Sequence, residues 1–145
     1  MDLGACGETE AEEVSTFIGN PKVEILDYCV GGRAVVRLCE DWVVEFYERD
    51  VQYCVTVPRG SISDGASIPR FFHRLLPPGE YWREAIIHDH LYSIGWPRLL
   101  ADATMWQVMR ELGRMPWKRE MIFFGVRLFG WRAYREHARK RESVA

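Results

Sequence analysis

The pattern of apolar and polar positions divides the chain into two halves. Between residues 22 and 57, the segments KVEILDYCVGGRAVVRL and DWVVEFYERDVQYCVTV are rich in β-branched and aromatic residues, which favour strands. Gly31-Gly32 interrupts the first segment and Arg49-Asp50 the second, and each interruption separates two runs of strand length. A Gly-Gly pair between two such runs is typical of a hairpin turn. This half therefore predicts two hairpins in one small antiparallel sheet.

The second half has helical spacing, and its prolines and glycines mark the helix ends. The four helices expected are 69–76, 80–94, 98–112 and 117–140. Ser67 and Pro69 are typical of a helix start, whereas Gly95 and Gly113 stand where glycine commonly ends a helix. Strands followed by a cluster of about four helices predict an α+β fold.

The composition is that of a soluble globular chain. The sequence has 145 residues, of which 48% are hydrophobic and 28% charged, enough for one domain with a core. Residues 1–14 are acidic and predict a flexible tail, which leaves residues 15–145 as a single α+β domain. The net charge of -2 gives no overall attraction to nucleic acid, so no nucleic-acid partner is expected.

Targeting and disulfide signals are not recognisable in the sequence. No apolar segment approaches the length of a membrane span, and the start of the chain does not resemble a signal peptide. The four cysteines lack CxxC spacing, which predicts reduced thiols rather than disulfides or zinc ligands.

The segment AIIHDHLYSIGW places His88 and Asp89 inside an apolar run. Burying an unpaired carboxylate is costly, so such a group is paired, binds a metal or stays wet. Helical spacing puts His88 on one face with Glu84 and Tyr92, at the border of the stripe expected to face the core. The pair could cap neighbouring backbone at that border or form part of a functional site, and the segment alone favours neither.

Asp102 occupies a position in the expected third helix where the apolar stripe calls for a leucine. Near the helix start it could interact with the helix dipole and backbone amides. Alternatively, it could face the preceding helix and accept a hydrogen bond from His88. That bond would fix the imidazole tautomer and let the other ring nitrogen take a proton from water, which predicts a catalytic His88–Asp102 pair. Asp89 would then be available to a metal.

The segment ISDGASIPRFF precedes these helices, and turn and helix-start chemistry already explains its residue types. If the loop lies beside Asp89, the carboxylate of Asp64 adds a hard oxygen ligand of the kind that calcium and magnesium prefer. Ser67 and Arg70 would support that site, although Arg70 could also neutralise the two carboxylates without any metal.

Several of these motifs together resemble a bacterial and phage family known as domain of unknown function 1353. The resemblance spans residues 58–131 and rests on SDGASIPRFF, on HDHLY, on Ala101-Asp102 and on MIFFGVRLFGW. The family is frequent in phages and prophages. This implies a phage-derived protein located in the cytoplasm of the bacterial host or in the virion, where other virion proteins would be its partners.

HDHLY, followed by an aspartate on the next helix, is also similar to the catalytic core of phospholipase A2 enzymes. This resemblance covers about 20 residues and implies that His88 activates water, Asp89 binds calcium and Asp102 orients His88, with Tyr92 completing the motif. It implies a metal-assisted hydrolase acting on lipid or envelope esters, with a membrane as its partner. Ile86 and Ile87 replace the paired cysteines that are common before the histidine in secreted enzymes. The alternative is a non-catalytic virion or tail-assembly protein.

The last expected helix combines aromatic residues with a basic end. Core packing is the interpretation preferred for its aromatic residues Phe123, Phe124, Phe129 and Trp131, and a partner surface is the alternative. The basic end, which contains Arg132, Arg135, Arg139, Lys140 and Arg141, is interpreted as a solvated helix face, although it could also contact phosphate or lipid headgroups.

Overall fold

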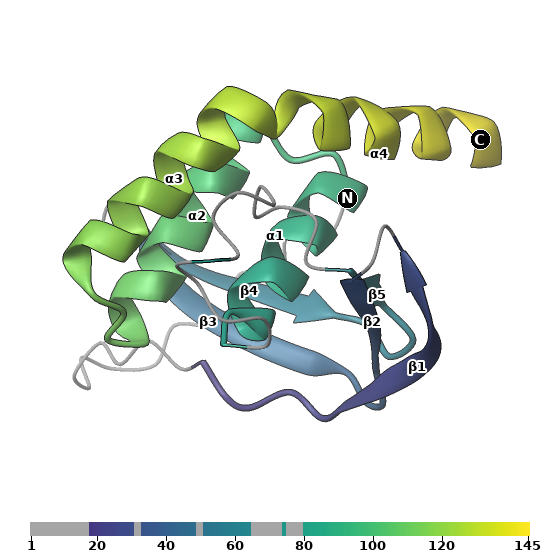
Figure 1. Cartoon of the computed structure of the whole chain (residues 1–145), viewed down its shortest axis with the longest axis horizontal. Helices are drawn as coiled ribbons and strands as arrows, with labels where there is room; N and C mark the ends of the chain where they lie inside the picture. Colours follow the sequence, from purple (N-terminus) through teal and green to yellow (C-terminus); the bar gives the residue numbers. More distant parts are fainter. Residues whose placement is uncertain (1–17, 31–32, 49–50, 65–73, 75–79) are drawn as a thin grey trace.

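The described part of the chain forms five strands and four helices (Figure 1). The computed structural model describes residues 18–30, 33–48, 51–64, 74 and 80–145. The strands are β1 (Val23–Val30), β2 (Arg33–Leu38), β3 (Trp42–Glu48), β4 (Val51–Val57) and β5 (Ile62–Ser63). The helices are α1 (Trp82–Ser93), α2 (Arg98–Glu111), α3 (Pro116–Phe129) and α4 (Trp131–Val144). Antiparallel strands followed by helices confirm the predicted α+β class.

Both predicted hairpins are present, but they form two sheets rather than one. β1 pairs with β2, and β3 pairs with β4 in a register that runs from Trp42 opposite Val57 to Glu48 opposite Val51. The expectation of a single sheet is wrong because β5 takes the second edge of β2. The turn at Gly60, which has a positive φ of 84°, brings the chain back from β4 to that edge.

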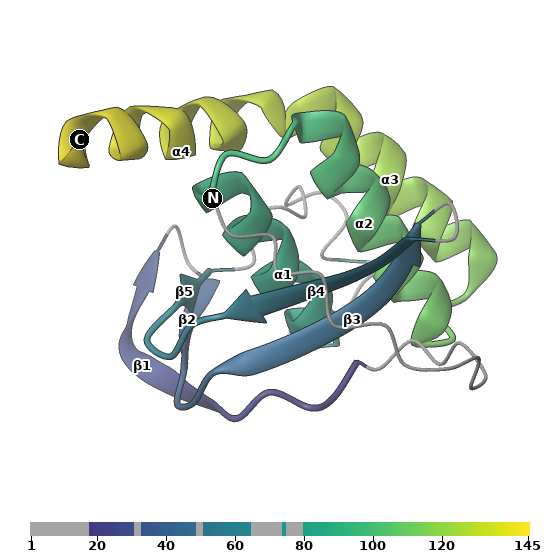
Figure 2. The same ribbon diagram turned by 180° about the vertical axis from the view of Figure 1, so that it is seen from behind.

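Helix α1 is the centre of the domain. It lies between the strands and the other helices, as the two opposite views show (Figures 1 and 2). Its residues Ile87 and Leu91 are completely buried in a core that also contains Val44 and Phe46 of β3. Burying these apolar side chains is the main force that holds the strands to the helices. Any polar side chain on the inward faces of α1 is therefore enclosed.

The long final helix predicted over 117–140 is two helices. The chain changes direction at Gly130, between α3 and α4 (Figure 1). A Cβ atom at this position would lie 2.5 Å from the carbonyl oxygen of Val126 and 3.3 Å from the hydroxyl of Tyr92. Only glycine therefore fits where the two helices meet above α1, and the continuous periodicity of the sequence did not show this break.

Two other expectations fall on residues that the structure does not describe. They are the acidic tail over residues 1–14 and the helix over 69–76, of which only Arg74 is described. In the described part of the chain, no helix is long and apolar enough to cross a membrane.

Candidate functional site

The contact predicted between His88 and Asp102 is confirmed. The Nε2 atom of His88, on α1, lies 2.7 Å from Oδ1 of Asp102, on α2. A short connection of four residues joins the two helices and makes this contact reachable. Asp102 lies near the start of α2, but its side chain is completely buried and faces the preceding helix, as the second interpretation expected.

Tyr92 belongs to the same cluster. Its hydroxyl donates a 2.6 Å hydrogen bond to Oδ1 of Asp102, the oxygen that also faces His88. One helical turn separates His88 from Tyr92 on α1, and their ring centroids lie 4.1 Å apart. Three residues predicted as one catalytic group therefore do lie together.

Two arginines complete the surroundings of Asp102. Nη1 of Arg127, on α3, lies 2.8 Å from Oδ2, and Nε of Arg98 lies 3.8 Å from the same oxygen. Arg98 is also fixed in place, because it donates to the carbonyl oxygens of Val126 and Arg127. We call the five residues His88, Tyr92, Arg98, Asp102 and Arg127 the Asp102 network. Sequence reasoning missed Arg127, because only the packing of α3 brings it to α2.

The hydrogen bonds decide the charge state of the network. Burial alone raises the pKa of Asp102, but the hydrogen bonds from His88, Tyr92 and Arg127 outweigh it and hold the pKa below its ordinary value. Burial and the bond to Asp102 raise the pKa of Tyr92 well above its ordinary value. Asp102 is therefore an ionised acceptor, so Nε2 of His88 carries a hydrogen. When the imidazole is neutral, Nδ1 is then the nitrogen that can accept a proton.

The Asp102 network is closed to solvent at its centre. The exposed fraction of His88, Tyr92 and Asp102 is 0%. None of the three lines the three pockets of about 360, 220 and 430 Å³ that the described residues form. In the part of the chain that the structure describes, these three side chains therefore have no direct contact with solvent, which a catalytic base needs.

Asp89 lies on a different side of α1, in an open pocket of about 360 Å³. Asp64 lines the same pocket, so the two aspartates predicted to lie near each other do share one cavity. The hydroxyl of Ser63, on β5, donates a 2.5 Å hydrogen bond to Oδ2 of Asp89. We call this cavity the Asp64–Asp89 pocket; its other lining residues are Tyr28, Val35, Ile62, Ala133, Glu136, His137 and Lys140.

The pocket suits a metal only in part. Two carboxylates provide the hard oxygen donors that calcium and magnesium prefer. However, the part of the chain that the structure describes contains no group of three or more His, Cys, Asp or Glu residues that could hold a metal ion. Ser67 and Arg70, the predicted supporting residues, lie outside the described residues. The metal stays a prediction.

His137, on α4, is a pocket residue that sequence reasoning missed. Burial lowers its pKa, and the nearby Asp89 carboxylate acts in the opposite direction. Its ring centroid also lies 6.2 Å from that of Tyr92, so His137 stands between the pocket and the Asp102 network. Its position three residues after Tyr134 and four after Ala133, on the inward face of α4, was the signal that could have found it.

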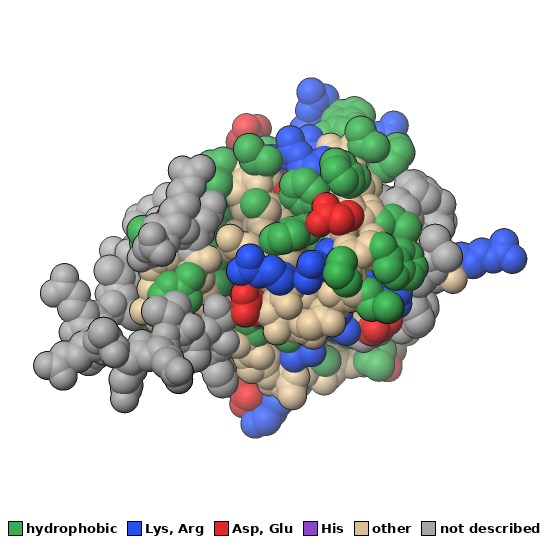
Figure 3. All heavy atoms as spheres, turned by 90° about the vertical axis from the view of Figure 1, so that its left-hand side faces the viewer, with side chains coloured by type: hydrophobic (Ala, Val, Ile, Leu, Met, Phe, Trp, Pro, Cys, Tyr) green, Lys and Arg blue, Asp and Glu red, His purple; other side chains and the backbone are tan. Residues whose placement is uncertain are grey.

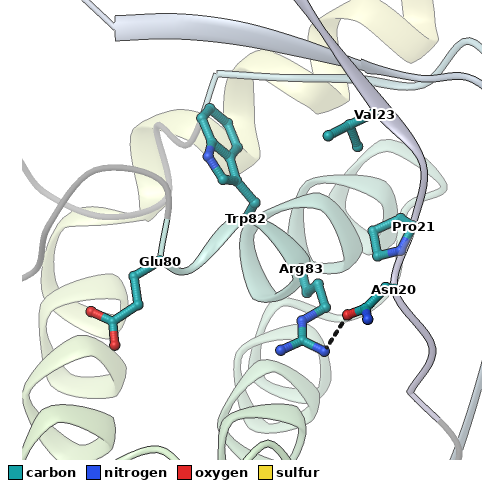
Figure 4. Close-up of a pocket in the computed structure, with 6 residues that line it drawn as sticks. All are labelled: Asn20, Pro21, Val23, Glu80, Trp82 and Arg83. Carbon is teal, nitrogen blue, oxygen red and sulfur yellow. Dashed lines mark hydrogen bonds between the residues drawn. The ribbon is translucent and has the colours of Figure 1, made fainter.

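A second hollow, of about 220 Å³, contains none of the predicted site residues (Figure 4). It lies where the start of α1 meets the segment before β1. Arg83 points toward that segment and donates a 2.9 Å hydrogen bond to Asn20. This bond ties α1 to the segment before β1.

A family model matches residues 36–126, which include Asp64, His88, Asp89 and Asp102. The chain belongs to the family described as protein of unknown function DUF1353. The match ends within α3, so α4 and His137 lie outside it. No curated protein and no solved structure matches the chain.

Proposed function

We propose that the chain is a phage- or prophage-encoded hydrolase in which His88 activates water to cleave an ester of a lipid or of the cell envelope. The observation that carries this proposal is the geometry around Asp102. One carboxylate oxygen accepts from both Nε2 of His88 and the hydroxyl of Tyr92. The next residue after His88, Asp89, lines an open pocket. This combination supports the resemblance to the catalytic core of phospholipase A2.

The proposed reaction uses His88 as base and then as acid. Nδ1 takes a proton from water while the water oxygen attacks the ester carbonyl carbon. The bond from that carbon to the alcohol oxygen then breaks, and the departing oxygen receives the proton from the imidazolium. Asp102 positions the ring and stabilises its positive charge, and Tyr92 holds Asp102. Because His88 has no exposed surface, this reaction requires a movement of the surrounding residues that lets the ester reach Nδ1.

The same burial favours a second candidate, a non-catalytic virion or tail-assembly protein. In that case the Asp102 network joins α1, α2 and α3 as a structural lock. Arg127 supports this candidate, because its cation already neutralises the Asp102 carboxylate that would otherwise stabilise an imidazolium.

Turnover assays on wild type and His88→Gln separate the two candidates. The hydrolase predicts hydrolysis of at least one member of an ester and phospholipid panel, tested with and without divalent cations. His88→Gln should lower turnover by about 10²–10⁴ while circular dichroism shows it folded at the assay temperature. Glu136→Gln is the matched control, because it lines the pocket but has no role in the proposed reaction.

The structural lock predicts the opposite pattern. A folded wild type that is inactive on the whole panel would contradict the hydrolase. His88→Gln should then only destabilise the fold, by about 1–3 kcal/mol, because it disturbs a buried hydrogen bond to a charged group.

A further inference from the structure

Helix α3 exposes an apolar stripe on the side opposite its buried face. Trp117, Phe124 and Leu128 are exposed by 51%, 59% and 67%, and their spacings of seven and four residues place them on one side of the helix. Ile122 and Val126, on the other side, are buried in the core. Figure 3 shows hydrophobic side chains gathered on this end of the molecule, with Lys and Arg side chains among them. The interpretation of the aromatic residues as core is therefore wrong for Phe124, and equally for Phe129 and Trp131, which are also exposed.

A further exposed aromatic residue lies at the bend. Trp131 begins α4 directly after Gly130, three residues beyond Leu128. Trp131 is exposed by 43%, and the guanidinium carbons of Arg132 and Arg135 lie 5.7 Å and 4.8 Å from its ring centroid. At this end of the stripe, the apolar surface and positive charge are adjacent.

The charge of this part of the chain differs from that of the whole. Residues 116–145 contain eight Lys or Arg and three Glu, a net charge of +5, whereas the chain as a whole carries -2. Arg132, Arg135 and Arg139 line a groove of about 430 Å³ together with Trp131 and Glu136. The Glu136 carboxylate is paired with Lys140 at 3.1 Å, so the arginines dominate the groove.

We propose that the outer face of α3 and α4 binds the surface of an anionic lipid bilayer. The exposed apolar side chains would enter the boundary between headgroups and acyl chains, a depth at which aromatic side chains are enriched. They are Trp117, Phe124, Leu128 and Trp131. The arginines of the groove would bind lipid phosphates. Charge complementarity favours a bilayer over a second copy of this chain, because two copies joined through this face would bring like charges together. The inference goes beyond the proposed function and holds for either candidate.

Vesicle sedimentation of the full chain tests this inference. We expect binding to vesicles that contain phosphatidylglycerol, and weak or no binding to vesicles of phosphatidylcholine alone. Phe124→Ser with Leu128→Ser, and separately Arg135→Glu with Arg139→Glu, should each reduce partitioning by at least about tenfold. Ile25→Ser with Val51→Ser, and Lys22→Glu with Arg59→Glu, are controls. They make apolar-to-serine and charge-reversing changes in the strand half of the chain and should bind as wild type does. Near-UV circular dichroism checks that every variant keeps its tertiary structure.

Three outcomes would overturn the inference. One is equal binding of wild type to neutral and anionic vesicles, and another is equal loss of binding in the control variants. The third is no binding to either vesicle. If sedimentation velocity then shows a dimer that Phe124→Ser with Leu128→Ser dissociates, the face is an interface between two copies instead.

Discussion

His88 and Asp89 are adjacent in the sequence and lie in opposite kinds of environment. His88 points into the Asp102 network, where its exposed fraction is 0%. Asp89 is half-buried and lines an open pocket with Asp64. One residue along an α-helix turns the side-chain direction by about 100°, which is enough to separate a sealed region from an accessible one. Adjacent titratable residues therefore need not share a task.

The carboxylates of Asp102 and Asp89 have different partners. Inside the domain, Asp102 receives two hydrogen bonds at Oδ1 and a cation at Oδ2, from residues on α1 and α3. In the pocket, Asp89 receives a hydroxyl from Ser63 and lies in the same cavity as Asp64. A buried ion is costly without partners. We therefore expect Asp102 to contribute to the stability of the fold, and Asp64 and Asp89 to contribute to cation binding. The following predictions test that contrast, from the largest expected effect to the smallest.

Removing the charge of Asp102 should have the largest effect on stability. Asp102→Asn leaves Arg127 without its buried carboxylate and should lower the free energy of unfolding by about 3 kcal/mol. Tyr92→Phe removes one hydrogen bond to Oδ1 of Asp102 and should lower the free energy of unfolding by about 1 kcal/mol. Urea denaturation measures both values. If the urea concentration at the midpoint of unfolding is the same for Asp102→Asn and wild type, the Asp102 network does not stabilise the fold.

The network should also make the protein sensitive to acid. Because the folded-state pKa of Asp102 is lowered, its contribution to stability is complete above the unfolded-state pKa of about 4. That contribution is lost as the pH falls through the folded-state pKa. Denaturation between about pH 5 and pH 2 should therefore show a steeper loss of stability in wild type than in Asp102→Asn. Parallel curves for the two proteins would contradict the assignment of an ionised Asp102.

Cation binding at the pocket should give the smallest effect. Asp64 and Asp89 place two carboxylates in one cavity, and millimolar calcium or magnesium should raise the melting temperature by about 2–4 °C, which corresponds to about 1 kcal/mol. Asp89→Asn should remove this rise, Asp64→Asn should weaken it, and Glu136→Gln should retain it. The idea fails if calorimetric titration of protein purified with chelator detects no binding of calcium, magnesium, manganese or zinc.

The pattern of apolar and polar residues was sufficient to predict both hairpins, the ends of α1 and α2, and the contact between His88 and Asp102. The β-rich runs predicted both hairpins, and Gly95 and Gly113, with positive φ of 84° and 69°, end α1 and α2 as expected. Asp102 on an apolar stripe indicated a buried partner, because a carboxylate in that position cannot remain unpaired. The catalytic and metal-binding roles of the site residues stay predictions.

By itself, the sequence determined the two hairpins, the helices α1 and α2 and the inward direction of Asp102, because these depend on periodicities within about ten residues. Only the tertiary structure decided that β5 divides the strands into two sheets and that Gly130 separates α3 from α4. It also brought Arg127 to Asp102 and left Phe124 on the surface. These features depend on how whole helices and strands pack. The spacing of apolar residues in α3 does not show which side of the helix packs against the core and which side is exposed.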